Sequence, residues 1–317
     1  MQWLRLRLRP LSAFGTVPIG DTLFGQLCWA IRHREGEPRL VELLSGYTSG
    51  KPFAVVSDLL PAGFVPRPPL LSRWGVSIDP EQRKRLKRAR WMPSAALSDG
   101  PKGWVRLALE ALDNQAVSEL SARPQQHNTL NRLTGTTGTG EFAPYTVEQL
   151  WYPSGTELDC HLVFDPERIS AEAIGALLGD IGASGFGRDA SIGLGRFLVT
   201  DEVQEEPNSA PDANAALTLA PCAPQGLDLD VERSCYQVFT RFGRHGDQAV
   251  QSGRPFKAPL LLARTGALFA AADGPPRPWV GQGLGGDGSI SRAIPATVHQ
   301  GYAPTLGVRL PLEEEAR

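Results

Sequence analysis

The alternation of apolar and polar side chains predicts a strand at the start of the chain. Leucines and arginines alternate from position 4 to position 9, which is the period-two pattern of a half-buried strand. After a loop over 10–19, apolar residues recur at helical spacing from Leu23 to Ile31, and Gly20-Asp21-Thr22 offers an N-cap. We therefore expect a helix over about 21–34, followed by a strand over 53–57.

The same order of elements returns after a long insertion. Residues 158–164 alternate as a strand, 166–178 have the periodicity of an amphipathic helix, and 196–200 predict a closing strand. Strand, helix, strand, insertion, strand, helix and strand is the order of a ferredoxin-like, RRM-related domain. We assign this domain to residues 1–203.

A smaller second domain is expected over 217–317, after an acidic, proline-containing linker that covers 201–216. Strand-like stretches occur at 217–219, 236–240, 260–263 and 308–312, and a glycine-rich loop is expected over 281–288. Inside the insertion of the first domain, the glycine-rich segment 135–140 predicts a hairpin tip or a disordered loop.

The glycine-rich segment 185–195 is the most informative motif. Its glycines follow the pattern G-x-G-x5-G-x-G, between a predicted helix and a predicted strand. Such glycines let a backbone adopt conformations that a Cβ would forbid, and let a polymer lie close to its amides. The spacing fits neither a P-loop nor a dinucleotide fingerprint. We expect it to hold a phosphodiester chain, and a glycine-rich turn without a ligand is the alternative.

Charge limits how nucleic acid could bind. The chain has 317 residues and a formal net charge of -2, so it is no global polycation, and any nucleic-acid site must be a local patch. A basic run over 83–90 follows a helix start at Asp79; it is either a solvated helical face or a contact for phosphate or an acidic partner. No stretch approaches the roughly 20 apolar residues of a membrane span, and the expected compartment is the cytoplasm.

Candidate catalytic chemistry is sparse. The four cysteines lie far apart without a C-x-x-C pair and predict reduced, mostly buried thiols rather than a zinc site. The histidines show no metal-ligand spacing, and Phe186 breaks a G-x-S-x-G pattern. His127 and His299 are expected in polar loops. Either could act as a general base toward a 2′-hydroxyl, as in a metal-independent ribonuclease, or contact RNA without chemistry.

Several segments together resemble one known family. They are Gly15 to Trp29 with its Gly-Asp-Thr-Leu-Phe-Gly core, the glycine loop at 185–195, 127–132 followed by 134–137, and 298–304. In these segments, spread from end to end, the chain resembles RAMP-superfamily CRISPR proteins, and among them the fourth subunit of the type III-A (Csm) effector complex.

The resemblance implies an α+β fold with two ferredoxin-like (RRM-related) domains that carry glycine-rich loops and long insertions. It also implies a non-catalytic subunit without cofactors that holds the repeat-derived 5′ handle of crRNA. Its expected partners are the large signature subunit and the first backbone RAMP subunit. Three alternatives stay open: a RAMP endoribonuclease that processes crRNA, a scaffold that binds only protein, and the equivalent subunit of another type III complex.

The predicted RNA contacts form three groups. Arginines give bidentate hydrogen bonds to phosphates, loop amides give uncharged donors, and histidine and asparagine side chains can recognise base edges or 2′-hydroxyls. No metal ligand is predicted. The glycine-loop group is Gly185, Gly187, Arg188, Ser191, Gly193, Gly195 and Arg196; the polar segment contributes His127, Asn128, Asn131 and Arg132; the second domain contributes Arg254, Lys257, Arg292 and His299.

Overall fold

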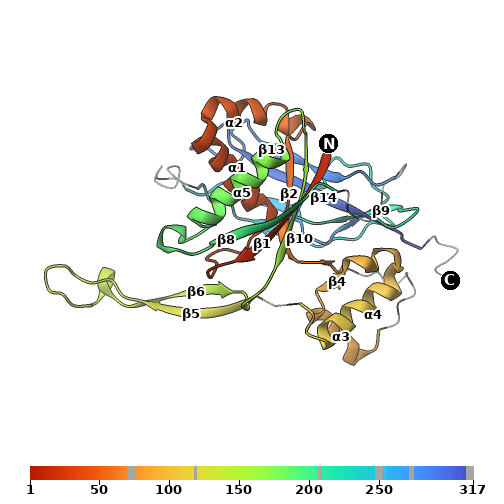
Figure 1. Ribbon diagram of the computed structural model, residues 1–317, viewed down its shortest axis with the longest axis horizontal. Helices are drawn as coiled ribbons and strands as arrows, with labels where there is room; N and C mark the ends of the chain where they lie inside the picture. Colours follow the sequence, from red (N-terminus) through yellow and green to blue (C-terminus); the bar gives the residue numbers. More distant parts are fainter. Residues whose placement is uncertain are drawn as a thin grey trace.

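The N-terminal region is built on a four-stranded antiparallel sheet (Figure 1). In the computed structural model this sheet contains β1 (Gln2–Pro10), β2 (Ala54–Pro61), β7 (Leu158–Phe164) and β8 (Phe197–Val203), in the order β2-β7-β1-β8. The crossovers are α1 (Gly20–Glu35), between β1 and β2, and α5 (Ala171–Ser184), between β7 and β8. This is the predicted ferredoxin-like order. The α+β class is confirmed.

The structure describes residues 1–69, 74, 76, 78–117, 120–205, 207, 209–246, 253, 255–270 and 275–311. Within these, no helix is long and apolar enough to cross a membrane. All four cysteines are free thiols, two buried and two half-buried, which agrees with the expectation of reduced, mostly buried thiols. A short helix, α2 (Glu37–Leu44), and a 3-10 turn, η1 (Tyr47–Ser49), connect α1 to β2.

The insertion between β2 and β7 forms two separate protrusions (Figure 1). One contains the pair β3 (Phe64–Pro66) and β4 (Trp91–Pro93), with α3 (Pro80–Arg88), η3 (Ser94–Ser98) and α4 (Gly100–Asp113). The other is a long hairpin of β5 (Ser121–His127) and β6 (Tyr145–Trp151), with η4 (Gly140–Phe142) near its tip. Segment 135–140 lies at the hairpin tip, as predicted.

The predicted basic helix is present as α3. The Asp79 carboxylate caps it by accepting a hydrogen bond from the Gln82 amide at 2.8 Å. Leu86 is its one buried residue, so its cations lie on a largely solvated helix.

The C-terminal half contains a second four-stranded sheet, ordered β12-β9-β14-β13, and a two-stranded ribbon. The sheet strands are β9 (Ala215–Thr218), β12 (Leu268–Phe269), β13 (Trp279–Gly285) and β14 (Val298–Val308); the ribbon strands are β10 (Val238–Arg241) and β11 (Leu260–Ala263). Among the described residues from 204 to 311 no helix occurs. In the described residues of this half we therefore see strands alone, and glycine and proline interrupt its apolar segments.

Two local predictions for this half were wrong. The strand expected at 308–312 lies at 298–308, and the glycine-rich segment 281–288 is largely the strand β13. Its glycines serve close packing: a Cβ on Gly281 would lie 2.1 Å from the Gly301 carbonyl oxygen, and one on Gly283 would lie 2.5 Å from that of Tyr47. Glycine here marks a crowded strand and not a loop.

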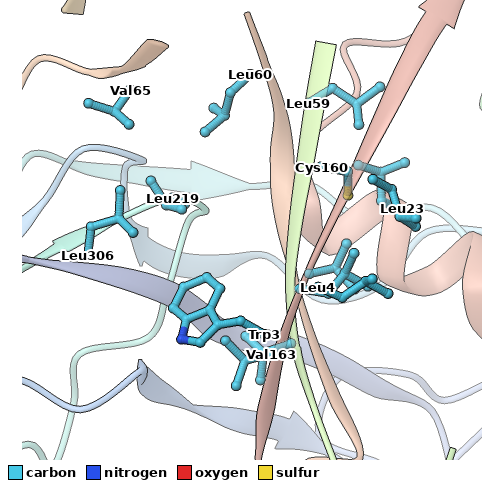
Figure 2. Packing of buried hydrophobic residues seen from close by; sticks show 14 of the residues in the cluster. Trp3, Leu4, Leu23, Leu59, Leu60, Val65, Cys160, Val163, Leu219 and Leu306 are labelled. Atoms are coloured by element: carbon cyan, nitrogen blue, oxygen red, sulfur yellow. The ribbon is translucent and has the colours of Figure 1, made fainter. Parts of the chain in front are cut away.

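One hydrophobic cluster runs through both halves of the molecule. Figure 2 shows part of it, with Leu4 and Val163 from the first sheet and Leu219 and Leu306 from the second half. On β14, the buried Gln300 side chain bonds both the amide and the carbonyl of Val56 on β2, each at 2.8 Å. Because the halves share a core, the division into domains at 1–203 and 217–317 stays a prediction.

The two long helices begin differently from the prediction. α1 has no side-chain cap of its own; instead Oδ1 of Asp58, on β2, accepts a hydrogen bond from the Gly20 amide at 2.7 Å. The N-cap assigned to 20–22 was wrong because the Asp21 carboxylate binds residues of the second half. α5 begins at Ala171, capped by Ser170, and not at 166.

Candidate nucleic-acid interface

The glycine-rich loop joins α5 to β8 and packs on the chain segment 11–19. All four of its motif glycines have positive φ, between 73° and 103°, which is the backbone region that favours glycine. A short 3-10 turn, η5 (Ala190–Ile192), lies between them. The packing is tight: a Cβ on Gly195 would lie 2.1 Å from the Phe186 carbonyl oxygen, whereas one on Gly193 would meet open space.

Most amides of this loop donate hydrogen bonds inside the protein. Phe186 N donates to Gly195 O at 2.9 Å, Gly195 N to Ala13 O at 2.7 Å, and Arg188 N to Thr16 Oγ1 at 3.0 Å. The amides of Ile192, Gly193, Leu194 and Arg196 are also used. The expectation that the loop amides serve RNA is therefore wrong for most of them, because they fix the shape of the loop. Exposed side chains of the loop are therefore the main groups available to a ligand.

Three polar side chains are exposed on the loop: Arg188, Ser191 and Arg196. The Arg188 guanidinium is 48% exposed and lies 3.3 Å from the Asp189 carboxylate. Its Nη2 donates to the Glu148 carbonyl oxygen on β6 at 2.8 Å. Arg188 thus joins the glycine loop to the β5–β6 hairpin.

The hairpin carries the predicted polar segment. Glu148 pairs with Pro124, and His127 lies three residues further out on β5, which is about 10 Å from the Arg188 contact. The His127 ring stacks on Tyr145, with centroids 5.3 Å apart and planes at 14°. His127 and Tyr145 therefore form an aromatic pair on the exposed hairpin, about 10 Å along the strand from the contact with the glycine loop.

The other polar residues of this segment lie toward the hairpin tip. Asn128 and Arg132 are exposed. The Asn131 side-chain oxygen accepts a hydrogen bond from the Leu133 amide at 2.9 Å, and the Asn131 amide donates to Thr136 O at 3.0 Å. Asn131 therefore shapes the tip, while Asn128 and Arg132 are free to meet a ligand.

His299 is not in a polar loop. It lies on β14 with 6% of its side chain exposed, and its Nε2 is 3.4 Å from Oδ2 of Asp21. The loop placement was wrong because the glycines and polar residues around it hide the strand pattern. A residue so enclosed offers no surface to RNA, and we leave it out of the proposed site.

The remaining second-domain cations lie near each other. Ala258 N donates to Ile290 O at 2.8 Å, which holds the segments of Lys257 and Arg292 side by side. Arg292 is exposed and Lys257 is half-buried, and burial lowers the pKa of the Lys257 ammonium. Arg254 lies outside the described residues.

An ion pair that joins the two halves escaped sequence reasoning. The fully buried Asp21 carboxylate accepts two hydrogen bonds from Arg241 on β10, at 2.6 and 2.8 Å. Burial alone would raise the pKa of Asp21, but His299 and Arg241 outweigh it and hold the pKa below its ordinary value. The Asp of the Gly-Asp-Thr core is the one signal that could have drawn attention to this site.

A second carboxylate, that of the half-buried Asp58, lies beside this pair. It accepts hydrogen bonds from the Gly20 amide at 2.7 Å and from the Thr265 hydroxyl at 2.6 Å. Burial raises the pKa of Asp58 to about 7, although both hydrogen bonds act in the opposite direction. The folded protein therefore favours the neutral acid, and its stability falls as pH rises from about 4 through 7.

We expect Asp58→Asn to remove this pH dependence. A pKa shift of this size corresponds to about 4 kcal/mol of folding free energy. Because Asp58 keeps some exposure, we expect about half of this energy. The variant should therefore be more stable than the wild type by about 2 kcal/mol at pH 8, and the two proteins should have about the same stability at pH 4. Urea unfolding of both proteins at the two pH values checks this. Parallel stability curves would contradict it.

The similarity of this chain to known proteins is found in its three-dimensional fold. No protein-family model matches the chain. No curated protein matches it either.

Solved structures do match, over almost the whole chain. One is a chain of the Csm1-Csm4 cassette in complex with cA4, with a TM-score of 0.59 and 16% identity, covering 98% of this chain and 100% of that one. Another is a chain of the Csm3-Csm4 subcomplex in the type III-A CRISPR-Cas interference complex, with a TM-score of 0.59, 13% identity and coverage of 98% and 100%. Csm4 is the component that both assemblies share. From end to end, the chain therefore shares its fold with a chain of each of these type III-A assemblies.

Proposed function

We propose that this chain is the non-catalytic, crRNA-binding subunit of a type III-A CRISPR effector complex. In this role it holds the repeat-derived 5′ handle of crRNA and joins the large signature subunit to the first backbone RAMP subunit. The observation that carries the proposal is the similarity of fold along the whole chain to chains from both Csm1-Csm4 and Csm3-Csm4 structures. The sequence resemblance, carried by separate segments, supports the same subunit.

The proposed RNA path runs from the glycine loop onto the β5–β6 hairpin. Arg188, Ser191 and Arg196 are exposed on the loop, where arginine side chains can bind phosphates in a bidentate manner. The stacked His127–Tyr145 pair lies about 10 Å from the Arg188 contact and offers an aromatic surface on which a base can stack. Asn128 and Arg132 extend the polar surface toward the tip.

The histidine environments favour binding over catalysis. His161 is packed in β7, where burial lowers its pKa to about 4. His245 Nε2 lies 2.8 Å from the Ser291 hydroxyl, and His299 faces Asp21. His33 lies in the last turn of α1 against the Trp29 ring. Besides His299, His127 is the candidate that the sequence offers for a ribonuclease, and its ring stacks on Tyr145. If isolated protein cleaved repeat RNA and His127→Ala abolished the cleavage, the ribonuclease alternative would hold instead.

The test is RNA affinity after removal of the loop cations. We expect Arg188→Ala/Arg196→Ala to weaken binding of a labelled RNA with the host's repeat-derived 5′ end by at least about tenfold, measured by fluorescence anisotropy. The loss of two phosphate contacts should also lower the salt slope of log affinity by about 1.4.

Arg34→Ala is the matched control, because Arg34 is an exposed arginine of α1 that pairs with Asp180 of α5 at 3.0 Å and is not part of the glycine loop. It should bind RNA as the wild type does. Equal affinities for the control and the double variant would contradict the proposed site.

A further inference from the structure

The end of the β10–β11 ribbon exposes two phenylalanine side chains. Phe242 and Phe256 are each 70% exposed. Arg244 pairs with Phe256, and Lys257 N donates to Gly243 O at 2.9 Å, so Phe242 and Phe256 are diagonal neighbours on the paired chains. Diagonal side chains of an antiparallel pair lie on the same face, about 7–8 Å apart. Two rings of this kind form a small aromatic platform.

An arginine lies over one ring of this platform: the Arg244 guanidinium is 5.8 Å from the centre of the Phe256 ring. A second pair lies further along the ribbon, where Arg264 is 4.8 Å from the centre of the Phe239 ring on β10. Residues 236–264 contain five lysines or arginines and one acid, in a chain with a net charge of -2. Of these cations, Arg244 and Arg264 are exposed, so the ribbon presents a local positive surface of the kind that a nucleic-acid site in this protein needs.

The surface continues onto α1. A side chain at Gly246 would lie 3.1 Å from Nε1 of Trp29, so the end of the ribbon touches that indole. Arg32 lies 5.1 Å from the centre of the Trp29 ring. Another ring–arginine pair, Trp29 and Arg32, therefore lies next to this end of the ribbon.

We propose that Phe242 and Phe256 form a base-stacking platform for single-stranded RNA. Aromatic rings beside arginines bind single strands through stacking and phosphate attraction. Phenylalanine and arginine are enriched at protein–protein interfaces as well. The excess of cations over acids in residues 236–264 favours a phosphate-bearing strand over a docked protein.

The platform and the glycine loop flank one short segment of chain. Thr16 binds the amide of Arg188 on the loop, and Asp21 binds Arg241 on the ribbon. Five residues span at most about 18 Å, so the contacts that hold the loop and the ribbon lie close together on this segment. The inference rests on the proposed function in that both sites take the same RNA.

The experiment compares two double variants of the full chain. Phe242→Leu/Phe256→Leu keeps apolar area and loses the rings, whereas Phe242→Tyr/Phe256→Tyr keeps both rings. With a labelled single-stranded RNA, the Leu variant should bind at least about tenfold more weakly than the wild type, because each stacked base contributes a factor of about five or more. The Tyr variant should stay within about threefold of the wild type. Leu261→Ala, an exposed apolar change on β11, is the control.

The outcomes separate this inference from the proposed function. If the Leu variant binds as the wild type does while Arg188→Ala/Arg196→Ala loses affinity, the platform is overturned and the glycine-loop site stands. If the Leu variant keeps its RNA affinity but loses a protein subunit in co-purification, the platform is a protein-docking surface. If the wild type binds no RNA, both proposals fail.

Discussion

Asp21→Asn should lower the free energy of unfolding by about 3–5 kcal/mol, the cost of breaking a buried ion pair by removing one partner. The Asp21 side chain has no exposed surface, and Arg241, its partner at 2.6 Å, is 21% exposed. The substitution keeps the size of the side chain but leaves the Arg241 charge without its counter-charge. Because this pair joins α1 to the ribbon, the loss should also loosen the contact between the halves. Urea denaturation at pH 7 measures the effect.

Asp180→Asn is the matched control. Asp180 pairs with Arg34 at 3.0 Å, but both side chains are more than half exposed, and such pairs contribute at most about 1 kcal/mol. The pKa of Asp21 lies below its ordinary value, so its stabilisation is present above pH 4 and is lost as pH falls further. Equal losses for Asp21→Asn and Asp180→Asn would contradict the account of this ion pair.

Gly195→Ala should destabilise the protein by about 3 kcal/mol or more, since it combines a left-handed backbone with overpacking. Gly195 has a φ of 73°, and a Cβ there would lie 2.1 Å from the Phe186 carbonyl oxygen, a backbone atom. The hydrogen bond from Phe186 N to Gly195 O at 2.9 Å would have to shift as well. Thermal and urea unfolding measure the loss.

Gly193→Ala isolates the backbone part of this effect. Gly193 has a φ of 95°, but a Cβ there meets open space. We expect it to cost about 1–2 kcal/mol from strain alone. If both variants lost the same stability, close packing of the loop would not be the reason for its glycines.

The first domain could be predicted because its elements are locally encoded. The leucines of β1 alternate inward, and the apolar stripe from Leu23 to Ile31 marks α1, so period and order sufficed for the ferredoxin-like topology. The glycine-loop conformation followed from the same logic, since all four glycines have positive φ. The hydrogen bonds of the loop amides could not be predicted, because their partners, such as Ala13 and Thr16, are distant in sequence.

The second half was harder because its strands are encoded by packing partners. Gly281 and Gly283 are needed in β13 because Gly301 and Tyr47 pack closely against them. Such contacts between distant residues cannot be read from the local sequence pattern. His299 was placed in a loop for the same reason. The sequence predicted a helix cap that includes Asp21, whereas the Asp21 carboxylate forms an ion pair with Arg241, which is 220 residues away in the chain. Tertiary contacts of this kind override local propensity.

The central claim is that this chain holds the 5′ handle of crRNA inside a type III complex. Affinity purification of the chain from its native host, with sequencing of the bound RNA and identification of the bound proteins, tests it most directly. The account predicts small RNAs that share one repeat-derived 5′ end, together with a large CRISPR subunit. A complex that holds the partner proteins without such RNA would contradict it and leave a scaffold that binds only protein.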